Sequence, residues 1–327
     1  MNKKDKTYQI LPITKRVDGS TIGIPMVKIT GRSSGPTLLL TAGIHGDEPE
    51  GVRTCLDLIS QLDSDQIHGT VVIVPVVNVP AYSMRKRGNP LDDFYYDLNR
   101  QFPGSQKGTF TQRLAYKLAK EIFPQADLIV DIHSGGSNMY CAKRSIINKD
   151  SEENLQLASA LGPGWDFIAM GAGTRKGVNN LTNTADQMGI PAVSIENGGI
   201  NGRLPDLFNK NVHDNVVAIK NVMKAFNIID DKPLYSDRLL VMDFEPIMAD
   251  NGGLIIFEQS CRIGREVKKG EKIITITDYF DNILEVVEAP YDGILLAIPA
   301  QVVLPQGCQI GSIGKIIRRI KPERVQV

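Results

Sequence analysis

The chain has 327 residues, and its 37 basic side chains balance 37 acidic ones, so its formal charge is zero. A balanced charge argues against a general nucleic-acid binder, which needs a basic surface, and gives no reason to expect a membrane as partner. No apolar run approaches the roughly 20 residues of a transmembrane helix. The basic start of the chain has no apolar segment behind it, so we expect no signal peptide.

The four cysteines are widely spaced, and no two of them form a CxxC pair. Four cysteines are too few for a disulfide scaffold in a chain of this length, so reduced thiols and a cytoplasmic location are expected. At roughly 150 residues per domain, the length suggests about two domains.

Residues 1 to about 235 alternate strand-like and helix-like segments. Short apolar runs predict strands, and apolar residues at helical spacing predict helices. The expected strands are 37–42, 70–77, 127–133 and 191–196, and the expected helices are 48–62, 111–123, 152–161, 181–188 and 211–226. Pro75 predicts a bulge or the end of its strand. This alternation predicts an α/β sheet with helices on both faces.

The pattern changes near residue 235. From there on, short β-branched runs alternate with glycine and proline, and no segment has convincing helical spacing. Such spacing is typical of a small all-β barrel or sandwich. The predicted domains are therefore residues 1–235 and residues 236–327.

The segment His45-Gly46-Asp47-Glu48 lies where a buried strand gives way to a helix. Ligands of α/β sheets bind at the carboxyl ends of strands, and His133 ends another expected strand, so the three side chains should meet at one edge. Two histidines and one glutamate, with a fourth position left to water, are the usual catalytic zinc set. Alone, the HxxE pattern is common by chance, and His133 alone could be a core histidine bonded to the backbone.

Two further segments carry suitable chemistry. Asn99 and Arg100 lie in an aperiodic loop, and a guanidinium matches a substrate carboxylate with two hydrogen bonds; the alternative is a salt bridge at the surface. Glu196 ends a strand, where a carboxylate near a metal can take the proton of a bound water; the alternative is a helix cap or an ion pair.

Four motifs, GIHGDEPEG, DLNRQFPG, DIHSGG and PAVSIENGG, follow one another between residues 37 and 199. In this order they resemble the succinylglutamate desuccinylase/aspartoacylase family, relatives of the zinc carboxypeptidases. The resemblance implies a zinc-carboxypeptidase-like mixed sheet flanked by helices. It also implies one Zn²⁺ per chain, held by His45, Glu48 and His133.

The same resemblance implies the roles of the other site residues. Glu196 would be the general base, and Asn99 and Arg100 would bind the carboxylate of the acylated amino acid. Arg87 falls where the family places an arginine that polarises the scissile carbonyl. Arg85 lies only two residues away and is the alternative.

Two aspartates, Asp97 and Asp186, have expected roles in the site and in the choice of substrate. Asp97 is expected to orient a ligand histidine, as such carboxylates often do. Aspartoacylases read the aspartate side chain with an arginine about ten residues before the catalytic glutamate, and here that count reaches Asp186. An acid there would repel an acidic side chain, which favours substrates with a neutral or cationic one, such as a diamino acid, over N-acyl aspartate or glutamate. The alternative is that Asp186 lies on a solvated helix face.

The C-terminal segment resembles the barrel-sandwich domains of lipoyl and biotinyl carriers at residues 267–273 and 288–293. No lysine stands between them at 277–281, so the resemblance comes with no expected biotin or lipoate. We expect this domain to restrict access to the metal site or to mediate homo-oligomerisation.

The sequence thus predicts a zinc-dependent amidohydrolase that deacylates a small N-acyl amino acid, with neither nucleic acid nor membrane as partner. Two alternatives remain. One is a metallocarboxypeptidase that removes C-terminal residues from small peptides. The other is a catalytically inactive homologue that only binds a small molecule.

Overall fold

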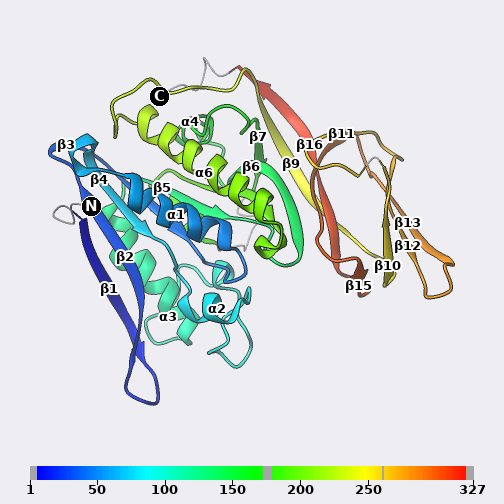
Figure 1. Ribbon diagram of the computed structural model, residues 1–327, viewed down its shortest axis with the longest axis horizontal. Coiled ribbons are helices and arrows are strands. Elements are labelled where there is room, and N and C mark those ends of the chain that lie inside the picture. The colour runs from blue at the N-terminus through cyan, green and yellow to red at the C-terminus, as the bar shows by residue number, and fades with distance from the viewer. Residues whose placement is uncertain (1–5, 172–178, 260, 322–327) are drawn as a thin grey trace.

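Four parallel strands form the centre of the molecule (Figure 1). The computed structural model describes residues 6–171, 179–259 and 261–321. The central strands are, in spatial order, β4 (His68–Val74), β3 (Ser33–Ala42), β5 (Leu128–His133) and β8 (Ala192–Gly199). All four predicted strands are confirmed, and β4 ends one residue before Pro75.

Helices cover both faces of this centre, as predicted. Leu38 and Leu40 of β3 pack in one core with α1 (Pro49–Gln61), α4 (Glu152–Ser159) and α6 (Pro205–Ala225). Leu39 faces the other way, into a core with α3 (Phe110–Lys117) and α5 (Leu181–Gln187). Side chains alternate along a strand, so the run of leucines in β3 serves both cores.

Some helix limits differ from the predictions. The segment predicted as one helix over 111–123 consists of α3, a π-helical turn at Leu118–Ile122 and a 3-10 turn at Phe123–Gln125. Helix α6 begins six residues earlier than expected, with Pro205 in its first turn, where a missing N–H costs nothing. A short helix, α2 (Val79–Met84), was not predicted.

The sheet extends far beyond its parallel centre. The hairpin of β1 (Lys6–Lys15) and β2 (Thr21–Thr30) adds antiparallel to β4. On the other side, β6 (Met139–Ile147) pairs antiparallel with β8, followed by β7 (Phe167–Met170) and β9 (Leu239–Met248). None of the strands β1, β2, β6 and β7 was predicted, because polar or exposed residues interrupt the apolar pattern of β1, β2 and β6, and β7 has only four residues.

The C-terminal segment continues this same sheet. Strand β16 (Gln309–Ile320) pairs with β9, β14 (Gly293–Pro299) pairs with β16, and β14 also returns to pair with β6. The strands β6, β7, β9, β16 and β14 therefore close on one another as a ring. The two-residue β11 (Glu266–Val267) pairs with β14 at the edge of the sheet.

A second sheet has four strands, β13 (Ile283–Glu288), β12 (Lys272–Thr277), β10 (Gly253–Phe257) and β15 (Val303–Leu304). The expected β-rich character after residue 235 is confirmed for the described residues. No break between sheets marks that residue, however, because β9 extends the sheet of the first 235 residues. The division into two domains stays a prediction.

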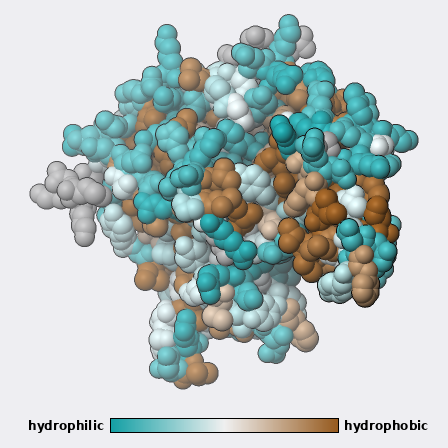
Figure 2. All heavy atoms as spheres, turned by 45° about the vertical axis from the view of Figure 1, so that its right-hand side comes forward, coloured by the Kyte–Doolittle hydropathy of each residue, from teal (hydrophilic) through white to brown (hydrophobic). Residues whose placement is uncertain are grey.

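Apolar side chains are exposed on the four-stranded sheet. Figure 2 shows hydrophobic residues gathered on the right of its view, toward the C-terminal strands. The exposed residues include Leu254, Ile256, Phe257, Ile283 and Val303. Contiguous apolar surface of this kind is often a contact surface.

Helix α1 lies unusually close to the central sheet. A Cβ at Gly51 would stand 2.6 Å from the Ile132 carbonyl oxygen of β5. Only glycine fits at that distance, so Gly51 sets how closely the helix that follows Glu48 approaches the strand that carries His133.

We predict that Gly51→Ala destabilises the protein by about 1–3 kcal/mol, the usual cost of overpacking. An ordinary Gly→Ala change in a helix stabilises the protein by up to about 1 kcal/mol. The sign of the change in unfolding free energy therefore tests whether α1 lies this close to β5. Urea unfolding measures the free energy, with the exposed Ser60→Ala in the same helix as control. A more stable Gly51→Ala variant would contradict this packing.

Candidate metal and catalytic site

The loop between β3 and α1 positions His45 and Glu48. Gly43 has a positive φ of 63°, and Gly46 packs so tightly on the backbone of Ala81 in α2 that no side chain fits there. The N–H of Gly46 donates to the carbonyl of Lys86 at 2.9 Å. Glu48 is the N-cap residue of α1, so its side chain starts from a fixed helix end.

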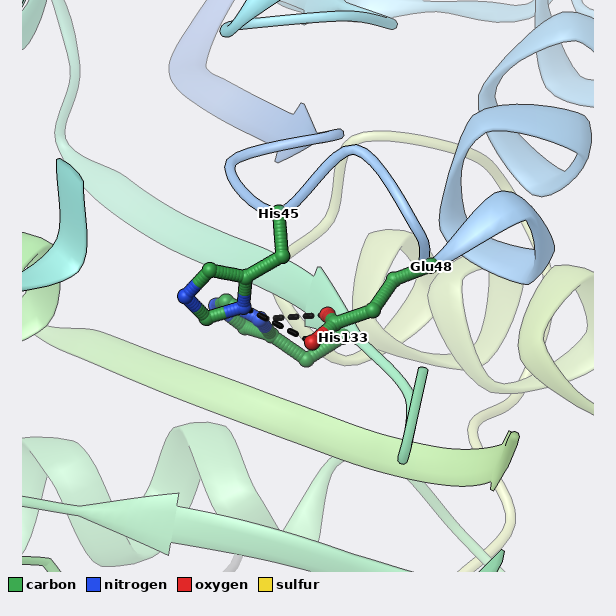
Figure 3. Close-up of side chains that lie close together, drawn as sticks. All are labelled: His45, Glu48 and His133. Atoms are coloured by element: carbon green, nitrogen blue, oxygen red, sulfur yellow. Dashed lines mark hydrogen bonds and ion pairs between the residues drawn. The ribbon is translucent and has the colours of Figure 1, made fainter. Parts of the chain in front are cut away.

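The side chains of His45, Glu48 and His133 meet in one buried cluster (Figure 3). The Nδ1 atom of His45 lies 2.7 Å from Oε1 of Glu48, and Nδ1 of His133 lies 2.8 Å from its Oε2. One nitrogen or oxygen ligand atom of each residue lies within 4.8 Å of the others. Two imidazoles and a carboxylate at this spacing can hold a metal ion.

A carboxylate stands behind each histidine. Nε2 of His45 lies 3.0 Å from Oδ1 of Asp97, and Nε2 of His133 lies 2.8 Å from Oδ2 of Asp131. Such partners fix the orientation of a ligand imidazole. Asp97 was expected here, whereas Asp131 was missed, although it stands two residues before His133 on the same face of β5.

The cluster is electrostatically coupled. Burial alone would raise the pKa of Glu48, but His45 and His133 outweigh burial and hold that pKa well below its usual range. Burial lowers the pKa of His133, but Asp131 and Glu48 outweigh it and raise the pKa well above its ordinary value. The carboxylate is thus ionised at neutral pH and ready to serve as a ligand.

Glu196 stands beside this cluster. In the register of the sheet it is the neighbour of His133 on β5 and of Arg144 on β6. Its Oε2 atom is buried and accepts no hydrogen bond. Burial raises the pKa of Glu196 and Arg144 lowers it, with a net rise. An unbonded carboxylate with a raised pKa is suited to accept and return a proton.

Arg87 lies at the cluster, whereas Arg85 does not. Nε of Arg87 donates to Oδ2 of Asp97 at 3.2 Å, and its NH1 lies 3.5 Å from Oε1 of Glu48. Arg85 ends α2 in a left-handed conformation and does not line the cavity at the site. Of the two candidates, only Arg87 is among the described residues that line the cavity.

Asn99 and Arg100 lie on a 3-10 turn at Leu98–Arg100 that faces the same cavity. Oδ1 of Asn99 accepts from the N–H of Leu181 at 2.9 Å, which fixes the amide. NH1 of Arg100 donates to the carbonyl of Asn99 at 2.8 Å. Within the described part of the chain Arg100 makes no ion pair, so the alternative of a surface salt bridge is not what the structure shows.

One cavity of about 630 Å³ is lined by His45, Arg87, Asn99, Arg100, His133 and Glu196. The C-terminal segment forms its opposite wall and is bonded to the loop after β5. The N–H of Ala300 donates to the carbonyl of Asn138 at 2.8 Å, and Nε2 of Gln301 donates to that of Ser137 at 3.0 Å. The wall residues from this segment include Ala297, Gln301, Val303, Leu304, Pro305 and Ser312.

Asp186 lies on helix α5, as expected, but its side chain does not reach the cavity. Its Oδ1 accepts from Nδ2 of Asn154 at 2.8 Å, between α5 and α4, and it is not among the described residues that line the cavity. The argument that Asp186 repels acidic substrates is therefore wrong, because its carboxylate is bonded to Asn154 and does not line the described cavity. Its charge gives no reason to exclude N-acyl aspartate or glutamate.

Comparison with known proteins identifies the family. Residues 34–222 match the model of the succinylglutamate desuccinylase/aspartoacylase catalytic domain. The chain belongs to this family. It is 28% identical to the N-alpha-acetyl-L-2,4-diaminobutyric acid deacetylase of Halomonas elongata, over 95% of this chain and 91% of that protein.

Solved structures agree over nearly the whole chain. The succinylglutamate desuccinylase/aspartoacylase of Rhodobacter sphaeroides is 27% identical, with a TM-score of 0.82 and coverage of 96% of both chains. The product-bound ectoine utilization protein EutE (DoeB) of Ruegeria pomeroyi is 24% identical, with a TM-score of 0.81 and coverage of 94% of both chains. The mixed α/β fold is thus shared with these proteins.

We predict that His133→Ala abolishes stoichiometric metal binding, because two ligands rarely hold a divalent ion against dialysis. Purified protein is loaded with Zn²⁺ as the probe ion, dialysed and measured by mass spectrometry of the metal. The exposed His213→Ala on α6 serves as control. Equal metal content in both variants would contradict the site.

The structure gives Asp186 a measurable effect on stability. Burial raises its pKa from 3.8 to about 6, although Asn154 opposes the shift. A carboxylate with a raised folded-state pKa destabilises the folded protein as pH rises from about 4 to 6, and the cost stays constant above that.

We therefore predict that the free energy of unfolding of Asp186→Asn rises relative to that of the wild type by about 1–2 kcal/mol between pH 4 and pH 7. This figure is smaller than the full pKa shift would give, because Asp186 is partly exposed to solvent. Urea unfolding at both pH values measures this, with the exposed Asp93→Asn as control. If the difference in unfolding free energy between variant and wild type does not change with pH, burial does not raise the pKa of Asp186. Deacylase activity of Asp186→Asn should stay close to that of the wild type.

Proposed function

We propose that the chain is a zinc-dependent hydrolase that cleaves the amide bond of a small N-acyl amino acid. The observation that carries this is the position of Glu196, an unbonded carboxylate one strand away from the His45–Glu48–His133 cluster and on the same cavity. Relatives named for deacetylation and desuccinylation of amino acids support the reaction class.

The donor set suits zinc. Two imidazole nitrogens and one carboxylate leave a fourth tetrahedral position for water or substrate, which is the common arrangement of catalytic zinc sites. When bound, zinc lowers the pKa of a coordinated water and polarises a carbonyl. The ligands would be His45, Glu48 and His133, with Asp97 and Asp131 orienting the two imidazoles.

Glu196 would move the proton. Its free oxygen would accept a proton from the attacking water and return it to the leaving amine. Arg87, held by Asp97, would stabilise the negative charge that develops on the acyl oxygen. Asn99 and Arg100 would bind the carboxylate of the amino acid, because the guanidinium of Arg100 has no carboxylate partner in the part of the chain that the structure describes.

The C-terminal wall favours small substrates. Residues from Ala297 to Ser312 stand opposite the cluster, and their backbone is bonded to the loop after β5. A polypeptide needs an open groove, so this wall weighs against the metallocarboxypeptidase alternative. We further propose that residues 236–327 form the domain that restricts access.

Two wider expectations accompany this proposal. We expect a homo-oligomer, with the exposed apolar face of the four-stranded sheet as a contact surface, which light scattering can test. We expect the enzyme to act in the cytoplasm, where its four unpaired cysteines stay reduced. Among the described residues, no helix is both long and apolar enough to span a membrane.

We predict that Glu196→Gln lowers kcat by about 10²–10⁴-fold, the usual contribution of a general base, while the zinc content is unchanged. The assay is mass spectrometry of the products from N-acetyl and N-succinyl amino acids and from N-blocked dipeptides. The exposed Glu121→Gln serves as control.

The outcomes separate the alternatives. Free acid released from acyl amino acids, and lost in Glu196→Gln, supports the deacylase. Release of C-terminal residues from the dipeptides alone would make the chain a carboxypeptidase. Zinc binding with no hydrolysis of either class would leave the inactive binding homologue.

A further inference from the structure

Glu50 is a completely buried carboxylate in the first turn of α1. Each of its two oxygens accepts a hydrogen bond. Oε2 accepts from the hydroxyl of Ser134 at 2.7 Å, and Oε1 accepts from the backbone N–H of Gly199 at 3.1 Å. Burying an acid is unfavourable, and an apolar side chain would fill the same space. The two hydrogen bonds are therefore the reason for an acid at this position.

Both partners of Glu50 lie at the ends of strands that carry site residues. Ser134 comes directly after His133, which ends β5, and Gly199 ends β8 three residues after Glu196. Glu50 itself comes two residues after the ligand glutamate, at the start of α1. One carboxylate thus joins the three segments that carry the proposed metal ligands and the proposed general base.

Ser134 connects Glu50 to the metal cluster. Its backbone N–H donates to Oε2 of Glu48 at 3.2 Å, while its hydroxyl donates to Glu50. The same oxygen of Glu48 lies 2.8 Å from Nδ1 of His133. Because Ser134 is the next residue after His133 and is hydrogen-bonded to Glu48, a displacement of Ser134 changes the positions of both ligands.

The loop after β5 and the end of β8 are rich in glycine and pack closely on each other. The N–H of Gly135 donates to the carbonyl of Gly198 at 3.1 Å. A Cβ at Gly199 would lie 2.1 Å from the carbonyl oxygen of Met139. Glycine has more conformational freedom than any other residue, so such segments need fixed contacts to keep one conformation. Glu50 supplies one such contact to each segment.

Thr54 lies one helical turn after Glu50 and is equally buried. Its hydroxyl donates to the backbone carbonyl of Glu50 at 2.8 Å and accepts from Nδ2 of Asn215 in α6 at 3.3 Å. These two bonds join α1 to α6 and do not reach the strand ends. Thr54 is therefore a matched control for the loss of a buried hydrogen bond in the same helix.

We propose that Glu50 is a positioning residue, which holds Ser134 and Gly199, and through them His133 and Glu196, at the distances that metal binding and proton transfer require. Glu50 is not among the described residues that line the cavity, so it acts through its two partners. The part that concerns Glu196 rests on the proposed function, whereas the part that concerns His133 rests only on the metal site. Contacts behind metal ligands and catalytic groups set such distances.

Glu50→Leu fills a similar space and removes both acceptors. It should weaken Zn²⁺ binding by about 10–100-fold, the usual effect of losing a contact behind a metal ligand. Competition with a coloured chelator measures this affinity. The visible spectrum of the Co²⁺-loaded variant should differ from that of the wild type, because the spectrum depends on the geometry of the ligands. At saturating zinc, kcat should fall by about fivefold or more, with KM changed less than about threefold, because Glu50 does not contact the substrate.

Glu50→Gln separates the two hydrogen bonds from the charge. The amide oxygen of glutamine can accept from the N–H of Gly199, and its NH₂ group can donate to the hydroxyl of Ser134. This variant should keep the zinc affinity, the Co²⁺ spectrum and kcat within about threefold of the wild type. The control Thr54→Val should lower the melting temperature and leave the zinc affinity and kcat unchanged.

Three results would overturn the proposal. The first is a folded Glu50→Leu variant with the zinc affinity and Co²⁺ spectrum of the wild type. The second is an equal loss in Glu50→Gln and Glu50→Leu, because the charge rather than the two bonds would then matter. The third is an equal loss in Thr54→Val, because general loosening of the core would then explain the effect.

Thermal melting shows whether Glu50→Leu folds. If it does not, Ser134→Ala takes its place, because this change removes only the bond between Ser134 and Glu50. Weaker zinc binding and a changed Co²⁺ spectrum in Ser134→Ala would support the proposal, and wild-type values would refute it.

A failure of the proposed function gives a different result. If zinc-loaded wild type hydrolyses no acyl amino acid, the deacylase proposal fails, and the zinc affinities and Co²⁺ spectra still decide on Glu50. If the wild type is active and Glu50→Leu binds zinc weakly but keeps the wild-type kcat at saturating zinc, the part of the proposal that concerns Glu196 is wrong.

Discussion

The site depends on one buried carboxylate that joins two histidines from distant parts of the chain. Glu48 lies at the start of a helix, His45 three residues before it, and His133 85 residues after it at the end of a parallel strand. The register of β3, β5 and β8 sets the distance between these groups and brings Glu196 alongside. Close packing of Gly51 on β5 then fixes the helix against the sheet, and close packing of Gly46 on α2 fixes the loop.

The His45–Glu48–His133 cluster is buried, so its charged groups need polar partners around them. His45, Glu48 and His133 are nearly inaccessible to solvent, and unpaired charges in such a place are unfavourable. Asp97 and Asp131 balance the imidazoles from behind, and Arg87 joins Asp97 to Glu48. Glu196 alone among these carboxylates has no hydrogen bond, and this sets it apart as the group whose protonation can change without breaking the cluster.

Local patterns predicted the centre of the fold and most of the site. The sequence predicted that His45, His133 and Glu196 lie at the ends of strands, because each strand is a short apolar run. It also predicted that they meet, because the carboxyl ends of parallel strands share one edge of the sheet. Long-range pairing was not visible. Strand β6 carries Lys143 and Arg144 within its apolar pattern, so the strand was not predicted. Asp186 was misplaced because a residue count cannot tell which side of a helix faces the cavity.

The ring of β6, β7, β9, β16 and β14 limits how far this chain could be shortened. A chain that stopped near residue 235 would keep every residue of the metal cluster, yet it would leave β7 without its neighbour β9 and β6 without β14. Unpaired edges of this kind promote aggregation. The carbonyl of Leu296 that holds Arg144 would also be lost. The smallest unit that folds with a finished cavity is therefore nearly the whole chain, although the chemistry occupies only its first two thirds.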